Sequence, residues 1–143
     1  MKNVENRDIM HALNQRFRYT VKELNARLKQ FDLYASQWAI IYCLDSFGTM
    51  TQTEIWRYLN IEAPTVTRTL VRMEKAGWVI RKQGEDKRER IIELTSNALE
   101  KIPSIKKSVE SFDHEMLSDL SQQEKNQLYM LLSKMKTSGE TAE

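Results

Sequence analysis

The segment that most constrains the fold is a pair of short helices, predicted in the middle of the chain and joined by a tight turn. Thr51 and Glu54 have the spacing of a capping box, in which each side chain accepts a backbone N–H at a helix start. Asn60 tolerates the left-handed conformation that a sharp turn needs, and Pro64 suits the first turn of the next helix. Gly77 ends that second helix. This pattern predicts a helix-turn-helix.

A hairpin is predicted directly after these two helices. Residues 78–80 and 91–94 are short apolar runs typical of strands. Residues 81–90, between them, are polar and highly charged and contain one glycine. The pattern predicts two antiparallel strands with a long solvated tip. A hairpin at this position is a wing, so we expect a winged helix-turn-helix.

Long amphipathic helices are predicted on both sides of this unit. Apolar residues recur at spacings of three and four across residues 6–29, which predicts one long helix with an apolar stripe. Such a stripe has to be covered, either by the rest of the chain or by a partner subunit. A second helix is expected to start at Ser36, as its N-cap, to run to Asp45, and to be ended by Gly48.

Two more helices are predicted after the hairpin. Thr95 caps the first, and Pro103 inside it predicts a kink or a late start. Ser121 opens the last helix with another capping box, and residues 137–143 are expected to fray. The apolar sides of these helices carry Leu99, Ile102, Ile105, Val109, Phe112 and Met116, and then Leu128, Leu131, Leu132 and Met135.

Length and composition agree with a mainly helical single domain. The 143 residues include only four glycines and two prolines, which argues against an all-β fold. No apolar run approaches the roughly 18 residues of a membrane span, and the polar N-terminus does not look like a secretory signal. Cys43 is the single cysteine, so we expect a reducing, cytoplasmic setting and no membrane association.

The charges are unevenly distributed along the chain. The net charge is +2, but residues 57–90 hold nine Lys and Arg against five Asp and Glu, whereas residues 91–143 hold six against nine. A basic middle suggests a partner that carries phosphates.

The helix that begins near Pro64 has a surface suited to the major groove of DNA. On a helical wheel, Val66, Leu70 and Met73 fall on an inward side, opposite two threonines and two arginines. Arginine pairs bidentately with guanine, and threonine bonds to a phosphate or touches a thymine methyl group. The outward residues are Thr65, Arg68, Thr69 and Arg72.

Further contacts with DNA are expected on either side of this helix. Thr51 and Thr53, at the start of the preceding helix, lie where backbone N–H groups favour a phosphate. Lys87 and Arg88 lie at the wing tip, where an arginine suits a narrow minor groove. Each piece alone also fits an ordinary solvated surface, and their order along the chain is what favours DNA binding.

The sequence resembles the MarR/SlyA family of bacterial transcription regulators over residues 36–95. Asn60 stands where that family commonly has glycine, and Trp56 stands where it usually has a small residue. The similar stretches are Ser36-Gln37-Trp38, Thr51-Gln52-Thr53-Glu54-Ile55, residues 62–70, residues 73–81, Asp86-Lys87-Arg88 and Leu94-Thr95.

The resemblance implies roles for individual residues. Pro64, Thr65 and Arg68 match positions that meet bases, Arg88 matches the wing arginine of the minor groove, and Asp86 matches the carboxylate that orients it. With the residues above, the expected DNA-binding set is Thr51, Thr53, Pro64, Thr65, Thr67, Arg68, Thr69, Arg72, Asp86, Lys87 and Arg88.

The resemblance also implies a homodimer that binds a pseudo-palindromic operator in double-stranded DNA and acts as a repressor. The expected organisation is a dimerisation helix in residues 1–32, a winged helix-turn-helix in residues 33–95, and dimerisation helices in residues 96–143. The expected interface residues are Met10, Leu13, Phe17, Val109, Phe112, Leu128, Leu131 and Leu132.

Control by a small molecule is a further expectation, because many relatives respond to small aromatic or phenolic compounds. Phe17, Trp38 and Tyr42 are candidates to line such a site, although aromatic residues are also common in cores. Cys43 raises a redox-sensing alternative, but no Lys, Arg or His lies within a helical turn to lower its pKa.

Other classes of function are less well supported. The two histidines, His11 and His114, lie in different predicted helices and are too few for a metal site, so we expect no metal and no cofactor. The chain has no glycine-rich phosphate loop and no nucleophile motif, so we expect no enzyme activity. A winged helix that binds protein or RNA is the better alternative. It would give no reason for Arg68, Arg72 and Arg88 together.

Overall fold

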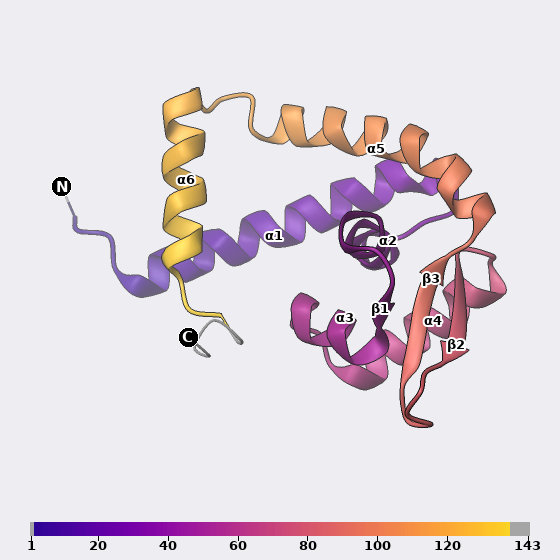
Figure 1. Ribbon diagram of the computed structural model, residues 1–143. Helices are drawn as coiled ribbons and strands as arrows, with labels where there is room; N and C mark the ends of the chain where they lie inside the picture. Colours follow the sequence, from indigo (N-terminus) through magenta and orange to yellow (C-terminus); the bar gives the residue numbers. More distant parts are fainter. Residues whose placement is uncertain (1, 138–143) are drawn as a thin grey trace.

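The computed structural model describes residues 2–137. The long helices α1 and α5 lie side by side, and α6 crosses at the end far from the small sheet (Figure 1). This mainly helical fold with a small sheet confirms the predicted class. The elements are α1 (Asn6–Leu28), a 3-10 turn η1 (Lys29–Phe31), α2 (Ala35–Phe47), β1 (Met50–Thr51), α3 (Gln52–Leu59), α4 (Ala63–Lys75), β2 (Val79–Gln83), β3 (Arg90–Leu94), α5 (Ser96–Met116) and α6 (Gln122–Lys134).

The predicted helix-turn-helix is confirmed, and local signals set its ends. The Thr51 hydroxyl accepts the Glu54 N–H at 3.1 Å, and the Glu54 carboxylate accepts the Thr51 N–H at 2.9 Å. Asn60 follows α3 with φ 55°, and Gly77 follows α4 with φ 85°. Both residues hold the left-handed backbone that the turns require.

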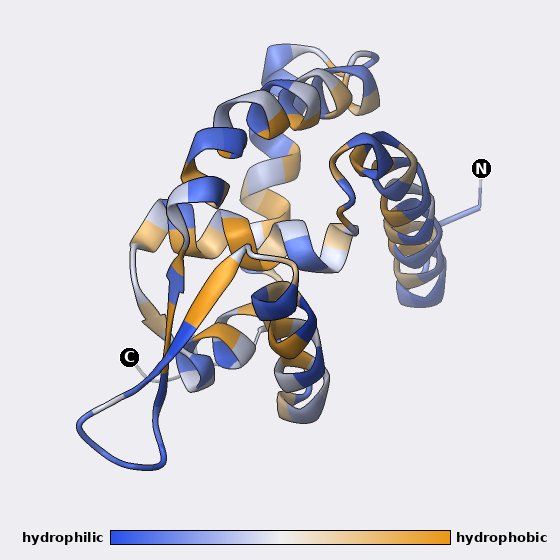
Figure 2. Cartoon of the chain, turned by 90° about the vertical axis from the view of Figure 1, so that its right-hand side faces the viewer, coloured by the Kyte–Doolittle hydropathy of each residue, from blue (hydrophilic) through white to orange (hydrophobic). Residues whose placement is uncertain are grey.

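The wing is confirmed, with longer strands than expected and a third strand that was not predicted. The sheet is antiparallel in the order β1-β3-β2. Met50 of β1 and Arg81 of β2 both pair with Ile92 of β3. The strands are apolar near the body and the loop between them is hydrophilic (Figure 2).

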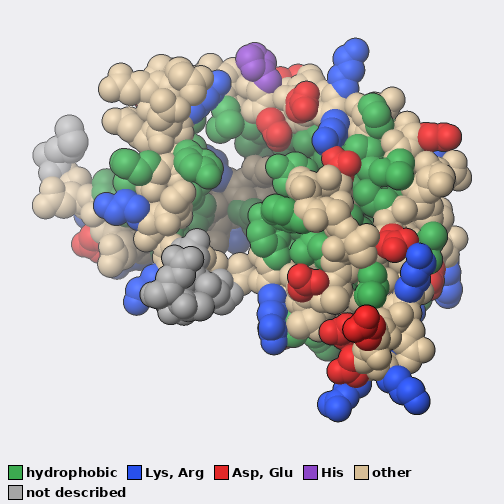
Figure 3. Space-filling view, viewed as in Figure 1, with side chains coloured by type: hydrophobic (Ala, Val, Ile, Leu, Met, Phe, Trp, Pro, Cys, Tyr) green, Lys and Arg blue, Asp and Glu red, His purple; other side chains and the backbone are tan. Residues whose placement is uncertain are grey.

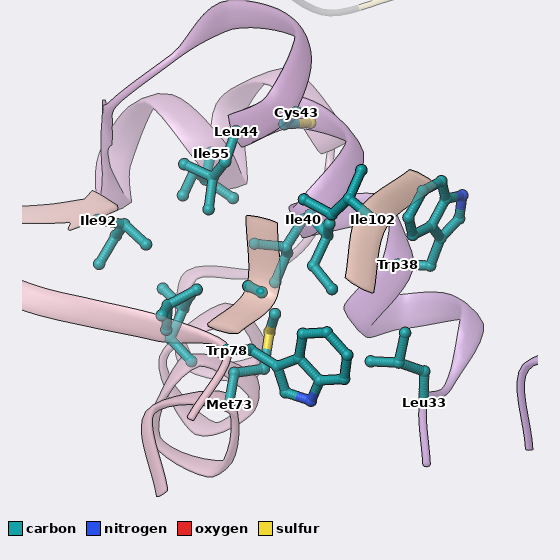
Figure 4. Close-up of a cluster of buried hydrophobic side chains, with 14 of the residues drawn as sticks. Leu33, Trp38, Ile40, Cys43, Leu44, Ile55, Met73, Trp78, Ile92 and Ile102 are labelled. Atoms are coloured by element: carbon teal, nitrogen blue, oxygen red, sulfur yellow. The ribbon is translucent and has the colours of Figure 1, made fainter. Parts of the chain in front are cut away.

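The core lies where α2, α3, α4 and the sheet meet the first half of α5. Ile55 and Leu70 are fully buried, and they hold α3 and α4 against this core. Trp38 and Trp78 are also buried there, among Ile40, Met73 and other apolar side chains (Figure 4). The angle between the two helices of the helix-turn-helix is therefore set by packing.

Three details of the helices differ from the sequence predictions. Ser36 is not the N-cap of α2; the cap is Tyr34, whose N–H donates to the Gln37 side chain at 3.0 Å. Leu99 is 53% exposed and not on the buried side of α5. The helix α5 is continuous through Pro103 and does not begin late. The predicted fraying of residues 137–143 falls almost entirely outside the described residues.

The residues expected at a dimer interface divide into two groups. Val109 and Phe112 are already buried within the chain, where the Arg27 guanidinium lies 5.5 Å from the centre of the Phe112 ring, so their assignment to an interface is corrected. Leu13 is half-buried. The others expose large apolar surfaces, with relative exposures of 46% for Met10, 66% for Phe17, 39% for Leu128, 55% for Leu131 and 47% for Leu132.

Within residues 2–137, no helix combines the length and the apolar character that crossing a membrane requires.

Candidate nucleic-acid interface

The helix α4 presents a polar face to solvent because its apolar side is anchored. Val66, Leu70 and Met73 are at most 1% exposed. On the opposite side Thr65, Arg68 and Arg72 are exposed, as predicted. The Arg68 guanidinium donates to the Thr65 hydroxyl at 3.3 Å, so these two side chains lie together at the start of the helix. Pro64, one position earlier, is exposed within the first turn.

Thr67 is not part of this face, which corrects its assignment as a DNA-binding residue. Its hydroxyl donates to the Ala63 carbonyl oxygen at 3.0 Å and accepts from the Gln52 side-chain amide at 2.5 Å. Thr67 therefore links the start of α3 to the start of α4. Thr69 is half-buried, and its hydroxyl donates to the Thr65 carbonyl oxygen at 2.9 Å.

The start of α3 is divided in a similar way. The Thr51 hydroxyl is engaged in capping the helix, and the residue is half-buried. Thr53, two positions further along the chain, is exposed. Of the two threonines predicted here, Thr53 is the one whose side chain faces outward.

The wing tip holds one arginine far out in solvent. The Arg88 side chain is 94% exposed. The Asp86 carboxylate accepts the Arg88 backbone N–H at 3.0 Å and lies 3.9 Å from the Arg88 Nε. This is the arrangement that the family resemblance implies for these two residues. Lys87 between them is exposed, and charged side chains gather at this tip (Figure 3).

Contacts that were not predicted tie the wing to α4. The Arg81 guanidinium of β2 pairs with the Glu74 carboxylate of α4 at 3.3 Å. The Thr95 hydroxyl donates to the Gly77 carbonyl oxygen at 2.6 Å, directly after α4. Seven positions separate Glu74 from Arg81, and a helix end and a turn lie between them, so no regular spacing signals the pair. These bonds fix the position of the hairpin relative to α4.

The three aromatic residues expected to line an effector site do not form one. Trp38 is 6% exposed and belongs to the core. Its ring centroid lies 6.4 Å from that of Tyr42, which is half exposed, while Phe17 is 66% exposed on α1. A groove of about 330 Å³ instead lies between α1, α2 and α4, and its lining residues are Val21, Asn25, Tyr34, Ser36, Gln37, Thr69 and Arg72.

Cys43 is 1% exposed, and burial raises the pKa of its thiol. Both effects keep the reactive thiolate scarce and shielded. We therefore expect the native protein to react with a thiol-specific disulfide reagent at pH 8 far more slowly than the same protein in denaturant. Native reactivity equal to that of a small free thiol would revive the redox alternative.

Among residues 2–137, no cluster of three or more His, Cys, Asp or Glu side chains is arranged to hold a metal ion.

Comparison with known proteins gives consistent matches. Residues 33–89 match the MarR family. The chain is 49% identical over 120 residues to the HTH-type transcriptional regulator YwoH of Bacillus subtilis, a match covering 84% of this chain and 88% of that protein. It is 35% identical over 88 residues to the HTH-type transcriptional regulator YdgJ of the same organism, covering 61% of this chain and 54% of YdgJ.

Solved structures share the fold. A MarR protein from Peptoclostridium difficile superposes with a TM-score of 0.85 at 20% identity, covering 94% of this chain and 89% of that one. A cysteine-to-serine mutant of MarR from Escherichia coli, complexed with operator DNA, gives 0.81 at 23% identity, covering 88% and 91%. Reduced AbfR bound to DNA gives 0.73 at 26% identity, covering 90% and 88%.

Proposed function

This chain belongs to the MarR family of transcriptional regulators, and we propose that it represses transcription as a homodimer that binds a pseudo-palindromic operator. The observation that carries the proposal is the outward-facing pair of Thr65 and Arg68 on an anchored α4, with Arg88 exposed on a wing that is tied to the same helix. A regulator of this kind meets DNA in the cytoplasm, which is part of the proposal.

In the proposed complex, α4 enters the major groove. Arg68 reaches a guanine edge and Thr65 a base or a phosphate. Arg72 lies one turn further along the same exposed face and reaches the backbone. Arg88 enters the adjacent minor groove, and Asp86 restricts the wing tip to a shape that points this side chain outward. Thr53 approaches a phosphate at the start of α3.

The proposed dimer covers the apolar side chains that α1 and α6 expose. Figure 3 shows a hollow between α6 and the rest of the molecule, with hydrophobic side chains on both sides. Phe17, Leu131 and Leu132 are each about half exposed or more, which is unusual for large apolar groups unless a partner covers them. A two-fold dimer would set the two α4 helices one turn of DNA apart, roughly 34 Å.

We expect Arg88→Ala to weaken operator binding and to reduce its dependence on salt. The change removes one cation from the minor groove, so the slope of log affinity against log salt should fall by about 1. Fluorescence anisotropy with a labelled operator measures both quantities. Lys107→Ala is the matched control, because Lys107 is exposed on α5 away from the proposed DNA face. An unchanged slope for Arg88→Ala would remove the wing from the proposal.

Release by a small ligand is also part of the proposal. The groove between α1, α2 and α4 is bordered by Thr69 and Arg72, so a ligand there would touch the DNA-reading helix. Its polar lining suits an aromatic compound that carries a hydroxyl or carboxylate group. We expect a hydroxybenzoate to lower the affinity for DNA, and Val21→Trp, which fills the groove, to abolish that response while DNA binding persists. A response that survives in Val21→Trp would place the ligand elsewhere.

A further inference from the structure

The chain that leaves α6 returns to the helix-turn-helix. The Asn60 side-chain amide donates to the Thr137 hydroxyl at 3.3 Å, although 77 positions separate the two residues. In Figure 1 the segment directly after α6 runs toward α3. The last described residue of the chain is therefore attached to the turn between α3 and α4.

Asn60 is suited to this contact for a reason that its backbone does not require. Its φ of 55° is a conformation that glycine adopts more readily, and glycine is common here in the family that the sequence resembles. Asparagine tolerates the same backbone and adds a side-chain amide. In this chain that amide holds Thr137.

A groove lies beside this contact. Its volume is about 570 Å³. The Arg57 guanidinium at its rim lies 5.4 Å from the centre of the Trp56 ring. Pro64, at the start of the proposed DNA-reading helix, is part of its wall. The lining residues are Trp56, Arg57, Asn60, Ile61, Glu62, Ala63 and Pro64.

We propose that residues 138–143 of the same chain dock in this groove and compete with DNA for the start of α4. The segment contains Glu140 and Glu143 and no Lys or Arg, so its charge is opposite to that of Arg57 and equal in sign to that of DNA. Glu62 also borders the groove and directs the acidic side chains toward the Arg57 side. Six residues reach about 20 Å, which is enough to cross the groove from Thr137.

The competition rests on the proposed function, whereas the docking does not, so the two are tested separately. Docking is measured by NMR of the indole N–H groups in the full-length protein and in a variant that ends at Thr137. The chain has three tryptophans, of which Trp38 and Trp78 are buried, so Trp56→Phe identifies the Trp56 signal. We expect truncation to shift the Trp56 signal and to leave the other two in place. Three unchanged signals would overturn the docking.

Competition is measured as affinity for a selected operator. We expect the variant that ends at Thr137 to bind about three- to fivefold more tightly than the full chain at low salt, with the difference shrinking as salt rises. The paired substitution Glu140→Gln and Glu143→Gln should reproduce much of this gain. Asn60→Gly, which keeps the turn and removes the amide, should give a smaller gain.

The two measurements separate the failures. If truncation shifts the Trp56 signal but leaves operator affinity equal or lower, the segment docks without competing and the proposal of competition is wrong. If neither protein binds operator DNA while the signal still shifts, the proposed function fails and the docking stands.

Discussion

Arg68→Ala is expected to lower operator affinity by about 1–3 kcal/mol, roughly 5- to 150-fold, and to relax base preference at one position in each half-site. Arg68 is exposed on the face of α4 opposite Val66 and Leu70, and its contact with Thr65 keeps it near the helix start. Alanine removes both the cation and the planar donor pair that recognises guanine.

Two variants separate specificity from charge in this experiment. Arg68→Lys keeps the cation but loses the bidentate geometry, so its affinity for unrelated DNA should match the parent while its preference for the operator falls. Lys107→Ala should leave both affinities unchanged. If Arg68→Ala retained the parent ratio of operator to shuffled-DNA affinity, α4 would not be reading bases through this residue.

Leu131→Glu is expected to convert the protein to a monomer and to lower operator affinity by at least about 100-fold. Leu131 is 55% exposed in the single chain, on the helix that we propose is covered by a second copy. A carboxylate buried there without a partner is strongly unfavourable. A monomer offers one α4 to the operator and loses the gain from two linked contacts. Analytical ultracentrifugation measures the mass, and anisotropy measures the affinity.

The control for this substitution adds the same charge elsewhere on α6. Gln123→Glu places a carboxylate in the exposed first turn, where negative charge favours a helix. It should leave both the mass and the affinity unchanged. A Leu131→Glu protein that stays dimeric would show that this part of α6 lies outside the interface.

The features that the sequence predicted well depend on residues close together in the chain. The capping boxes at Thr51 and Ser121 were confirmed because each one links positions three residues apart. The left-handed turn at Asn60 and the helix stop at Gly77 follow from the conformations that single residues allow. The Asp86–Arg88 contact spans two residues at the wing tip and fits the family pattern.

The features that the sequence did not predict depend on distant elements. Thr67 falls near the exposed face on a helical wheel, but the Gln52 amide reaches it from α3. Trp38 has the composition of a ligand site but packs into the core. Val109 and Phe112 share an apolar stripe that periodicity alone cannot assign to the same chain or to a partner, and the structure buries both within the chain.

Selection of binding sites from random duplex DNA by the full-length protein, at about 150 mM salt, tests the central claim most directly, because weak non-specific binding is suppressed there. The account predicts enrichment of an inverted repeat whose half-sites lie about one helical turn apart, each with a guanine that Arg68→Ala no longer selects. A folded protein that enriches no sequence, or only a single unrepeated site, would contradict a dimeric operator-binding regulator and favour a winged helix that binds protein or RNA.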